Sequence, residues 1–504
     1  MRLVIFPCLL IAMAAGSGAE DQTAALLLRV VDENGRPATA RVRLRDAEGR
    51  WQPVRAAQPQ VAIHPRFPEL GVVVEREARI TLPAGRTTLV VERGAEYRAV
   101  TLELDPAPGQ TLERQARLAR WIDMAGRGWW SGDLHVHRLP AEMPALLESA
   151  DLHFAPTITR WNENTNMAEW PAQTTWRAAA DRYYSVDNAE DEREWGAALF
   201  FGLKTPMPLY ARRSEYPPPT ATWSVARGRG AMIDQEKVIW WAAPVIAALV
   251  RPDTMGLAIN HFLEEGMLDS EAWGRPRDRE RYPGQAGFAR YVFDLYYRYL
   301  NSGFRVPASA GSANGVLKNP LGYSRSYAYL GKDFTPARWL DAQKAGNNFV
   351  TNGPMLFLRV RGGGPGTVLP GKTAAIRVEL EALSAGELEK AEVVVDGVVA
   401  QTFAAGGADR GRIRASARIA VQEGGWLAAR CFEKNAQTVR FAHTSPVYVG
   451  DVARRSAEAL AAMREWIDTY MERVGGLPPA ALSAKQKDEW LALCRQAREF
   501  YATR

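Results

Sequence analysis

The chain has 504 residues, of which 47% are hydrophobic and 24% charged, and its formal net charge is +6. The composition is ordinary for a folded protein, and the length exceeds what one hydrophobic core supports, so we expect several domains. The positive charge is spread along the chain without a basic block, which argues against a nucleic-acid partner.

Residues 1–19 resemble a secretory signal peptide. Arg2 precedes an apolar run over residues 3–15, and the small residues 17–19 follow it. The run is shorter than the ~20 residues that span a bilayer. We therefore expect an exported protein, periplasmic or extracellular, with an uncleaved N-terminal anchor as the alternative. No later segment is apolar enough to predict a membrane span.

Two regions have the pattern of β-sandwiches. In residues 24–118, the Asn34-Gly35 turn signal and the polar–apolar alternation of residues 41–45 predict an N-terminal sandwich. In residues 356–450, apolar runs on both sides of Asp396-Gly397 predict a second one. A helical tail is predicted over residues 451–504, where apolar residues recur with a period of 3.6 and Ser483 with Gln486 forms a capping-box pattern.

The middle region, residues 121–355, alternates short apolar strands with helical stretches. Strands are predicted near residues 154–158, 198–202, 255–259 and 306–308, and helices over 235–250 and 288–300. Such alternation favours a parallel α/β sheet or barrel. Barrel enzymes place their sites at the carboxyl ends of the strands.

The string GDLHVHR, residues 132–138, is the strongest chemical signal in the chain. It places Asp133, His135 and His137 two residues apart, so in a strand all three side chains leave one face. Two imidazoles and a carboxylate at one point are a common ligand set for Zn, Mn or Fe. The alternative is a strand end with hydrogen-bonded histidines and no metal.

Further ligands are sought in two places. His261, beside Asn260, follows an apolar run, although a loop or helix-start histidine is the alternative. Glu190 and Glu192 lie in an acidic stretch before a predicted strand, and a solvated charged face is the alternative there. The other histidines, residues 64, 153 and 443, are expected to be structural.

Three segments carry a family resemblance. GWWSGDLHVHR, VPASAGSANGVLKNPLGYSR and NNFVTNGP resemble motifs of the polymerase-and-histidinol-phosphatase (PHP) metal hydrolases, and most closely their CehA/McbA-type branch. The resemblance implies a distorted (β/α)7 barrel over residues 121–355 that binds two or three divalent metals. It implies hydrolysis of phosphoester, ester or carbamate bonds. It assigns metal ligands to His135, His137, His261 and Glu190, with Glu192 in reserve.

Two family motifs are broken in this chain. Residues 159–162 read TRWN where the family has T-D-H-N, and residues 312–315 read SANG where it has an Asp-x-His. We therefore expect one divalent metal, Zn, Mn or Fe, rather than a cluster. Arg138 or Arg160 could pair with an anionic substrate group or a developing oxyanion. A structural ion pair is the alternative for Arg160.

The sequence thus predicts an exported metal-dependent hydrolase of a small-molecule or glycan-like substrate. The alternative is a catalytically inactive PHP-like protein that binds a ligand such as a glycan, for which the tryptophans at 129, 130, 161, 170 and 176 could stack on sugars. Cys431 and Cys494 either pair or remain separate buried thiols, and the pattern leaves the oligomeric state open.

Overall fold

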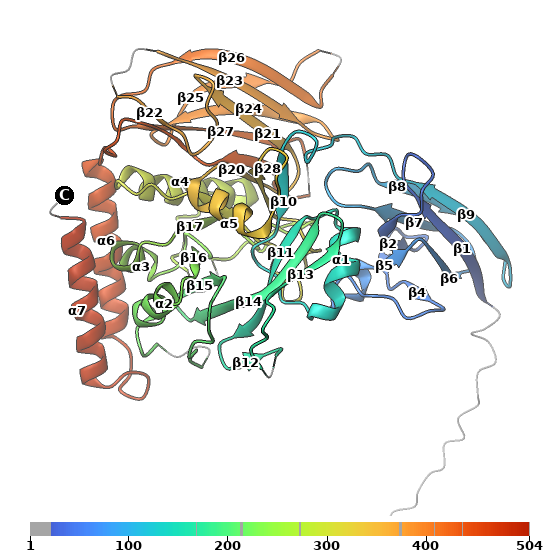
Figure 1. Cartoon of the computed structure of the whole chain (residues 1–504), viewed down its shortest axis with the longest axis horizontal. Coiled ribbons are helices and arrows are strands. Elements are labelled where there is room, and N and C mark those ends of the chain that lie inside the picture. The colour runs from blue at the N-terminus through green and yellow to red at the C-terminus, as the bar shows by residue number, and fades with distance from the viewer. Residues whose placement is uncertain are drawn as a thin grey trace, which may run out of the picture.

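The computed structural model of the protein describes residues 22–502 except 168, 212–214, 272–273, 372–374, 408 and 436. The predicted signal peptide lies outside the described residues. The protein is multidomain and rich in β-sheet, with a helical tail at its C-terminus (Figure 1). Among the described helices, none combines the length and apolarity needed to cross a bilayer.

The N-terminal module consists of two sheets that face each other. One has the order β4-β6-β1-β9, and the other the order β3-β2-β7-β8 with β5 paired to β2. Alternate residues of β1, including Leu26 and Leu28, are buried between the sheets because successive side chains of a strand point to opposite faces. The strands are β1 (Thr23–Val31), β2 (Thr39–Arg45), β3 (Trp51–Gln52), β4 (Arg55–Ala56), β5 (Val72–Glu75), β6 (Glu77–Pro83), β7 (Thr87–Glu92), β8 (Val100–Leu104) and β9 (Thr111–Arg117).

The central region follows with mixed strands and helices. Its strands are β10 (Trp129–Gly132), β11 (Phe154–Trp161), β12 (Asn164–Thr165), β13 (Thr175–Ala179), β14 (Arg182–Arg193), β15 (Gly196–Phe201), β16 (Met232–Gln235), β17 (Thr254–Ala258), β18 (Ala308–Ala310), β19 (Arg325–Tyr329) and β20 (Asn348–Thr351). Its helices are α1 (Met143–Ser149), α2 (Pro219–Gly228), α3 (Ala243–Val250), α4 (Gly284–Asn301) and α5 (Pro336–Ala345).

Backbone pairing runs around these strands in a closed ring. It passes from β10 through β11, β14, β15, β16 and β17 to β18. The segment after β10 closes the ring, because Val136 bridges Thr157 on one side and Asn314 on the other. β15 alone is antiparallel to its neighbours in the ring. The carboxyl ends of the other ring strands therefore share one end of the ring.

One predicted helix is wrong in its extent. Residues 235–250 were expected to be helical, but Gln235 ends strand β16 and α3 begins only at Ala243. Pro244 lies in the first turn of α3, where its missing N–H is tolerated, and proline could not sit inside a longer helix. The segment between Gln235 and Ala243 is instead a buried loop, and it enters the site described below.

The C-terminal part returns to β structure and then ends in two helices. Its strands are β21 (Met355–Val360), β22 (Val368–Leu369), β23 (Ile376–Leu383), β24 (Leu388–Val395), β25 (Val398–Ala404), β26 (Arg412–Ile419), β27 (Trp426–Glu433), β28 (Phe441–Thr444) and β29 (Val447–Val449). The tail helices α6 (Ala457–Gly475) and α7 (Ala484–Phe500) lie side by side against the central region (Figure 1). The predicted capping box at Ser483 is confirmed.

The tail shares a core with the central helices. Trp466 and Trp490 are fully buried in the same cluster as residues of α3 and α4. The hydroxyl of Tyr501 donates to the carbonyl of Pro244, at 2.9 Å. Cys431 in β27 and Cys494 in α7 are separate, buried, free cysteines, which resolves the alternative left open by the sequence.

Candidate metal centre

Two histidines and one glutamate meet at the carboxyl end of the ring. Nε2 of His135 lies 3.0 Å from Nε2 of His137. Oε2 of Glu190, on β14, lies 3.0 Å from Nε2 of His137 and 3.6 Å from Nε2 of His135. Ligand atoms of all three residues lie within 4.8 Å of one another, so this group could hold a metal ion.

The triangle of ligand atoms has a size that suits a small divalent metal. Ligands held at 2.0–2.1 Å from a tetrahedral metal are separated by about 3.3 Å from each other, and the three distances here are 3.0, 3.0 and 3.6 Å. Oε2 of Glu190 is buried and receives no well-directed hydrogen bond. A buried carboxylate oxygen without a donor is costly, and a cation at this point would remove that cost.

Asp133 positions the histidine segment but does not join the group. Its carboxylate accepts hydrogen bonds from the backbone N–H groups of His135, Ser312 and Gly322, at 3.0, 3.0 and 2.8 Å, and from the Ser312 hydroxyl. β10 ends at Gly132, so the expected continuous strand with three side chains on one face does not form. Asp133 turns instead toward the loop after β18.

Two glycines let that loop approach the histidines closely. A Cβ atom placed on Gly311 would lie 2.3 Å from Cβ of His135, and one placed on Gly315 would lie 2.2 Å from the carbonyl oxygen of His137. Both distances are far inside van der Waals contact. Glycine at these positions therefore allows the close packing that fixes the two imidazoles.

Glu236 supports His135 from behind. Its Oε1 lies 3.3 Å from Nδ1 of His135 and accepts a hydrogen bond from Nδ2 of Asn260, at 3.1 Å. The ammonium of Lys237 also contacts this oxygen and lies over the Trp240 ring. A carboxylate at Nδ1 favours the tautomer in which Nε2 is unprotonated and free to bind a metal.

Burial and charge set the protonation of the three side chains. Burial opposes ionisation of Glu190, but the two imidazoles hold its pKa well below the ordinary value. Burial would lower the pKa of His135, but the charges of Glu190 and Glu236 outweigh it, so this pKa is raised. For His137, burial dominates and the pKa is lowered. The arrangement thus supplies an ionised carboxylate and a neutral imidazole, both of which metals bind.

His261 lies outside this group. It is absent from the set of described ligand atoms that come within 4.8 Å of one another. Its ring stacks on Phe288, with the centroids 5.8 Å apart, and burial together with the charge of Lys237 lowers its pKa to about 3. The structure therefore brings together three of the four expected ligands. Asn260 does not belong to the group, but it donates a hydrogen bond to Glu236, which contacts His135.

The two arginines expected to act on substrate differ sharply. Arg138 is buried, and all of its N–H groups face acceptors: Glu142, the carbonyls of Ala62 and Ile63, and the side chain of Asn314. These contacts occupy the donors of Arg138 and give it a structural role, and its expected role toward substrate stays a prediction. Arg160 is half-buried, and its guanidinium lies 5.6 Å from the centre of the Trp170 ring.

Trp161 covers the outer side of the group. Its ring centroid lies 4.7 Å from that of His137, and its Nε1 donates to Oε2 of Glu192 at 3.0 Å. Glu192 therefore accepts a hydrogen bond from Trp161 and does not belong to the group of His135, His137 and Glu190. Of the two glutamates that the sequence offered as ligands, the structure thus places Glu190, and not Glu192, in the group.

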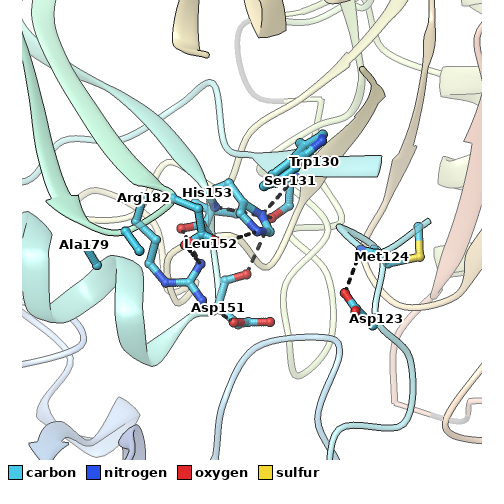
Figure 2. A network of polar contacts seen from close by, with 12 residues as sticks. Asp123, Met124, Trp130, Ser131, Asp151, Leu152, His153, Ala179 and Arg182 are labelled. Carbon is cyan, nitrogen blue, oxygen red and sulfur yellow. Dashed lines mark hydrogen bonds and ion pairs between the residues drawn. The ribbon is translucent and has the colours of Figure 1, made fainter. Parts of the chain in front are cut away.

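The remaining histidines have protein partners. Figure 2 shows His153 beside Ser131, with Asp151 and Arg182 in the same network. Nδ1 of His153 lies 2.8 Å from the Ser131 hydroxyl, and Arg182 pairs with Asp151 at 2.5 Å. Nδ1 of His64 accepts from the Arg66 N–H, and Nε2 of His443 lies 2.7 Å from the Tyr297 hydroxyl.

Sequence reasoning missed Glu236 and Lys237. In the segment MIDQEK, residues 232–237, charged residues directly follow an apolar strand. The same kind of pattern, a polar residue directly after an apolar run, made His261 a candidate ligand. The prediction of a helix from residue 235 hid that signal. Both residues follow β16 directly, so they belong to the end of the ring that carries the histidines.

The sequence matches no protein-family model, and a search of curated proteins finds no match. The chemistry of the site therefore rests on its own geometry.

Proposed function

We propose that the chain is an exported metal-dependent hydrolase of the PHP type, close to the CehA/McbA branch, that cleaves a phosphoester, ester or carbamate bond. The observation that carries this proposal is the triangle of His135, His137 and Glu190, with Glu236 behind His135. Three protein ligands with room for a fourth are the usual arrangement of a catalytic metal site, and a carboxylate behind a ligating histidine is its usual support.

The position of the site in the ring also supports the proposal. His135 and His137 follow β10, Glu190 lies near the end of β14, and Glu236 follows β16. Active sites of α/β barrels lie at the carboxyl ends of their strands. The antiparallel β15 is a departure from a regular (β/α)7 barrel, and distortion of this kind is what the family resemblance implies.

The side chains have distinct roles in this proposal. His135, His137 and Glu190 would hold one divalent ion, Zn, Mn or Fe, which would supply the Lewis acid that activates water at neutral pH. Glu236 orients His135, and Asp133 fixes the segment that carries both histidines. Arg160 is the cation that could pair with an anionic group of a small-molecule or glycan-like substrate.

Metal content tests the proposal directly. Protein purified without a histidine tag should contain about one equivalent of Zn, Mn or Fe by elemental mass spectrometry. His135→Ala, His137→Ala and Glu190→Gln should each lose it. His443→Gln, at a buried histidine bound to Tyr297, is the matched control and should keep the metal. Folded wild-type protein that contains no metal after incubation with each of these ions would refute the proposal.

A second function, ligand binding without catalysis, is favoured by the burial of the site. His135 and Glu190 are 4% and 2% exposed, and Trp161 lies against His137. Generic phosphodiester and ester substrates separate the two functions. Metal-loaded protein that hydrolyses none of them, but binds glycan, would favour this second function over the first.

A further inference from the structure

A groove lies between the start of β10 and the outer face of the sheet β21-β23-β26. Its volume is about 1110 Å³. Residues of the segment before β10, of β19, of the three-stranded sheet and of the glycine-rich loop 362–364 line it. None of the residues that line the groove belongs to the candidate metal centre.

Aromatic rings form part of the groove wall. Trp129 is buried, and its ring lies 5.4 Å from that of Tyr329 and 5.9 Å from that of Phe357. Tyr329 is 53% exposed, so one face of its ring is accessible to a ligand. The groove thus contains an exposed aromatic ring, Tyr329, that packs against the buried ring of Trp129.

Arginines and glutamates fill the rest of the wall in regular rows. Phe357 is opposite Glu381, which is opposite Arg414, and in the next row Arg359 is opposite Glu379. The side chains of these rows share the outer face of the sheet because residues two apart point the same way. The rows therefore present a fixed array of charges.

Positive charge exceeds negative charge in this array. Four arginines line the groove, at positions 127, 359, 377 and 414, against two glutamates, Glu379 and Glu381. Glu381 already contacts Arg127 and Arg414, at 3.5 and 3.6 Å, and Arg377 pairs with Glu379 at 3.0 Å. Arg359 has no polar partner among the described residues, and it is exposed. A guanidinium in that position is available to an anionic ligand.

We propose that this groove binds an anionic carbohydrate, a sugar chain bearing carboxylate or sulfate groups. The flat, exposed ring of Tyr329 suits the apolar face of a sugar ring. The planar guanidinium groups suit carboxylate and sulfate, which accept paired hydrogen bonds from arginine. Glu379 and Glu381 add acceptors for sugar hydroxyls. There is open space beside Gly362 in the groove, where an added Cβ would meet nothing within 4 Å.

The open shape favours a sugar chain over a compact metabolite. Sites for small molecules enclose most of the ligand surface, whereas the wall of this groove includes exposed side chains of β23, Arg377 and Glu379. Because its lining shares no residue with the candidate metal centre, the groove would be an accessory site that holds a polymer. The inference does not depend on the proposed hydrolase activity.

Binding to polymers of known charge tests the assignment. The full chain would be titrated with polygalacturonate, dextran sulfate, neutral dextran and polyphosphate, with affinity electrophoresis or calorimetry as readout. We expect binding to one or both anionic sugars, and much weaker binding to dextran and polyphosphate. The two anionic sugars distinguish a carboxylate preference from a sulfate preference.

Three variants locate the binding site. Tyr329→Ala and the double variant Arg359→Ala/Arg414→Ala should each weaken binding about tenfold, since a hydrogen bond to a charged group or a stacked ring contributes that much. Arg29→Ala is the matched control, because Arg29 is a 70% exposed arginine on β1 in the N-terminal module. Arg29→Ala should leave the affinity for the anionic sugars unchanged. All three variants should contain the same amount of metal as the wild type.

Several results would overturn the inference. If the protein binds neither anionic sugar, or binds neutral dextran as tightly as the anionic sugars, the ligand is not an anionic carbohydrate. Equal binding to polyphosphate that is insensitive to Tyr329→Ala would indicate a simple charged surface. An equal loss in Arg29→Ala would place the interaction outside the groove.

Discussion

Nδ1 of His135 lies 3.3 Å from Oε1 of Glu236, so the ring nitrogen that faces away from the candidate metal position has a carboxylate partner. Loss of that carboxylate charge should weaken metal binding by about 10–100-fold, the usual effect of removing such support. We predict this for Glu236→Gln, measured by competition with a chelator of known affinity. Glu192→Gln, at an acid that contacts Trp161 instead, is the control and should bind metal as the wild type does. Equal affinities in all three proteins would contradict the supporting role of Glu236.

Trp161 should slow the exchange of metal with solvent. Its ring packs against His137 at the outer side of the group, 4.7 Å between centroids. Trp161→Ala should release metal to excess chelator at least several-fold faster, while the amount bound at saturation stays the same. The time course of metal loss measures this. Trp176→Ala, at a tryptophan stacked on Tyr184, should release metal at the wild-type rate.

Arg138 should be important for stability and unimportant for chemistry. It is 1% exposed and joins Glu142 to the carbonyls of Ala62 and Ile63, so it links the N-terminal module to the ring. Arg138→Met leaves those acceptors buried without a donor and should lower the free energy of unfolding by about 3–5 kcal/mol. Urea denaturation measures the change. Arg160→Met should cost at most about 1 kcal/mol, the size of an exposed cation–π contact.

Glu215 should make the protein less stable as the pH rises. Burial, together with the charge of Glu194, raises the pKa of Glu215 from 4.5 to about 8. Between these values the unfolded chain has lost a proton that the folded protein keeps, so stability falls with rising pH by up to ~1.4 kcal/mol per pH unit. Above about pH 8, both states have lost the proton and this contribution stops changing.

The variant Glu215→Gln isolates that contribution. It cannot ionise, so its free energy of unfolding should lose this slope and should exceed that of the wild type at the alkaline end of the interval. Urea denaturation at several pH values gives both curves. Glu472→Gln, on the exposed face of α6, should retain the wild-type slope. Parallel curves for wild type and Glu215→Gln would show that Glu215 is not the group responsible.

The sequence was sufficient to identify the candidate metal ligands that lie in local patterns. His135 and His137 are two residues apart, so any extended backbone brings their side chains near each other. Glu190 is a buried member of an acidic stretch in β14, and only the pairing of β14 with β11 selects it over Glu192. The C-terminal helices were predicted well because their apolar stripes are long and regular.

The parts that sequence reasoning missed depend on contacts between distant segments. His261 follows a strand as expected, but its ring is directed to Phe288 on α4. Glu236 falls within the predicted helix because no local pattern marks the end of β16 at Gln235. Pro244 then places the start of the actual helix, α3, close to residue 243. Closure of the ring depends on pairing of Val136 with Asn314, almost two hundred residues later, which no local signal could predict.

Gly311 has a consequence for how sites of this kind are found. The histidine motif can adopt its present shape only if the facing segment has no side chain at that point, since a Cβ there would lie 2.3 Å from Cβ of His135. A search that uses the histidine pattern alone would therefore retrieve chains whose opposite segment leaves no space for the imidazole. Two short patterns, GDLHVHR and the distant SAGSANG, describe the pocket together. Joint occurrence of both is the more selective criterion for recognising the same pocket in other genomes.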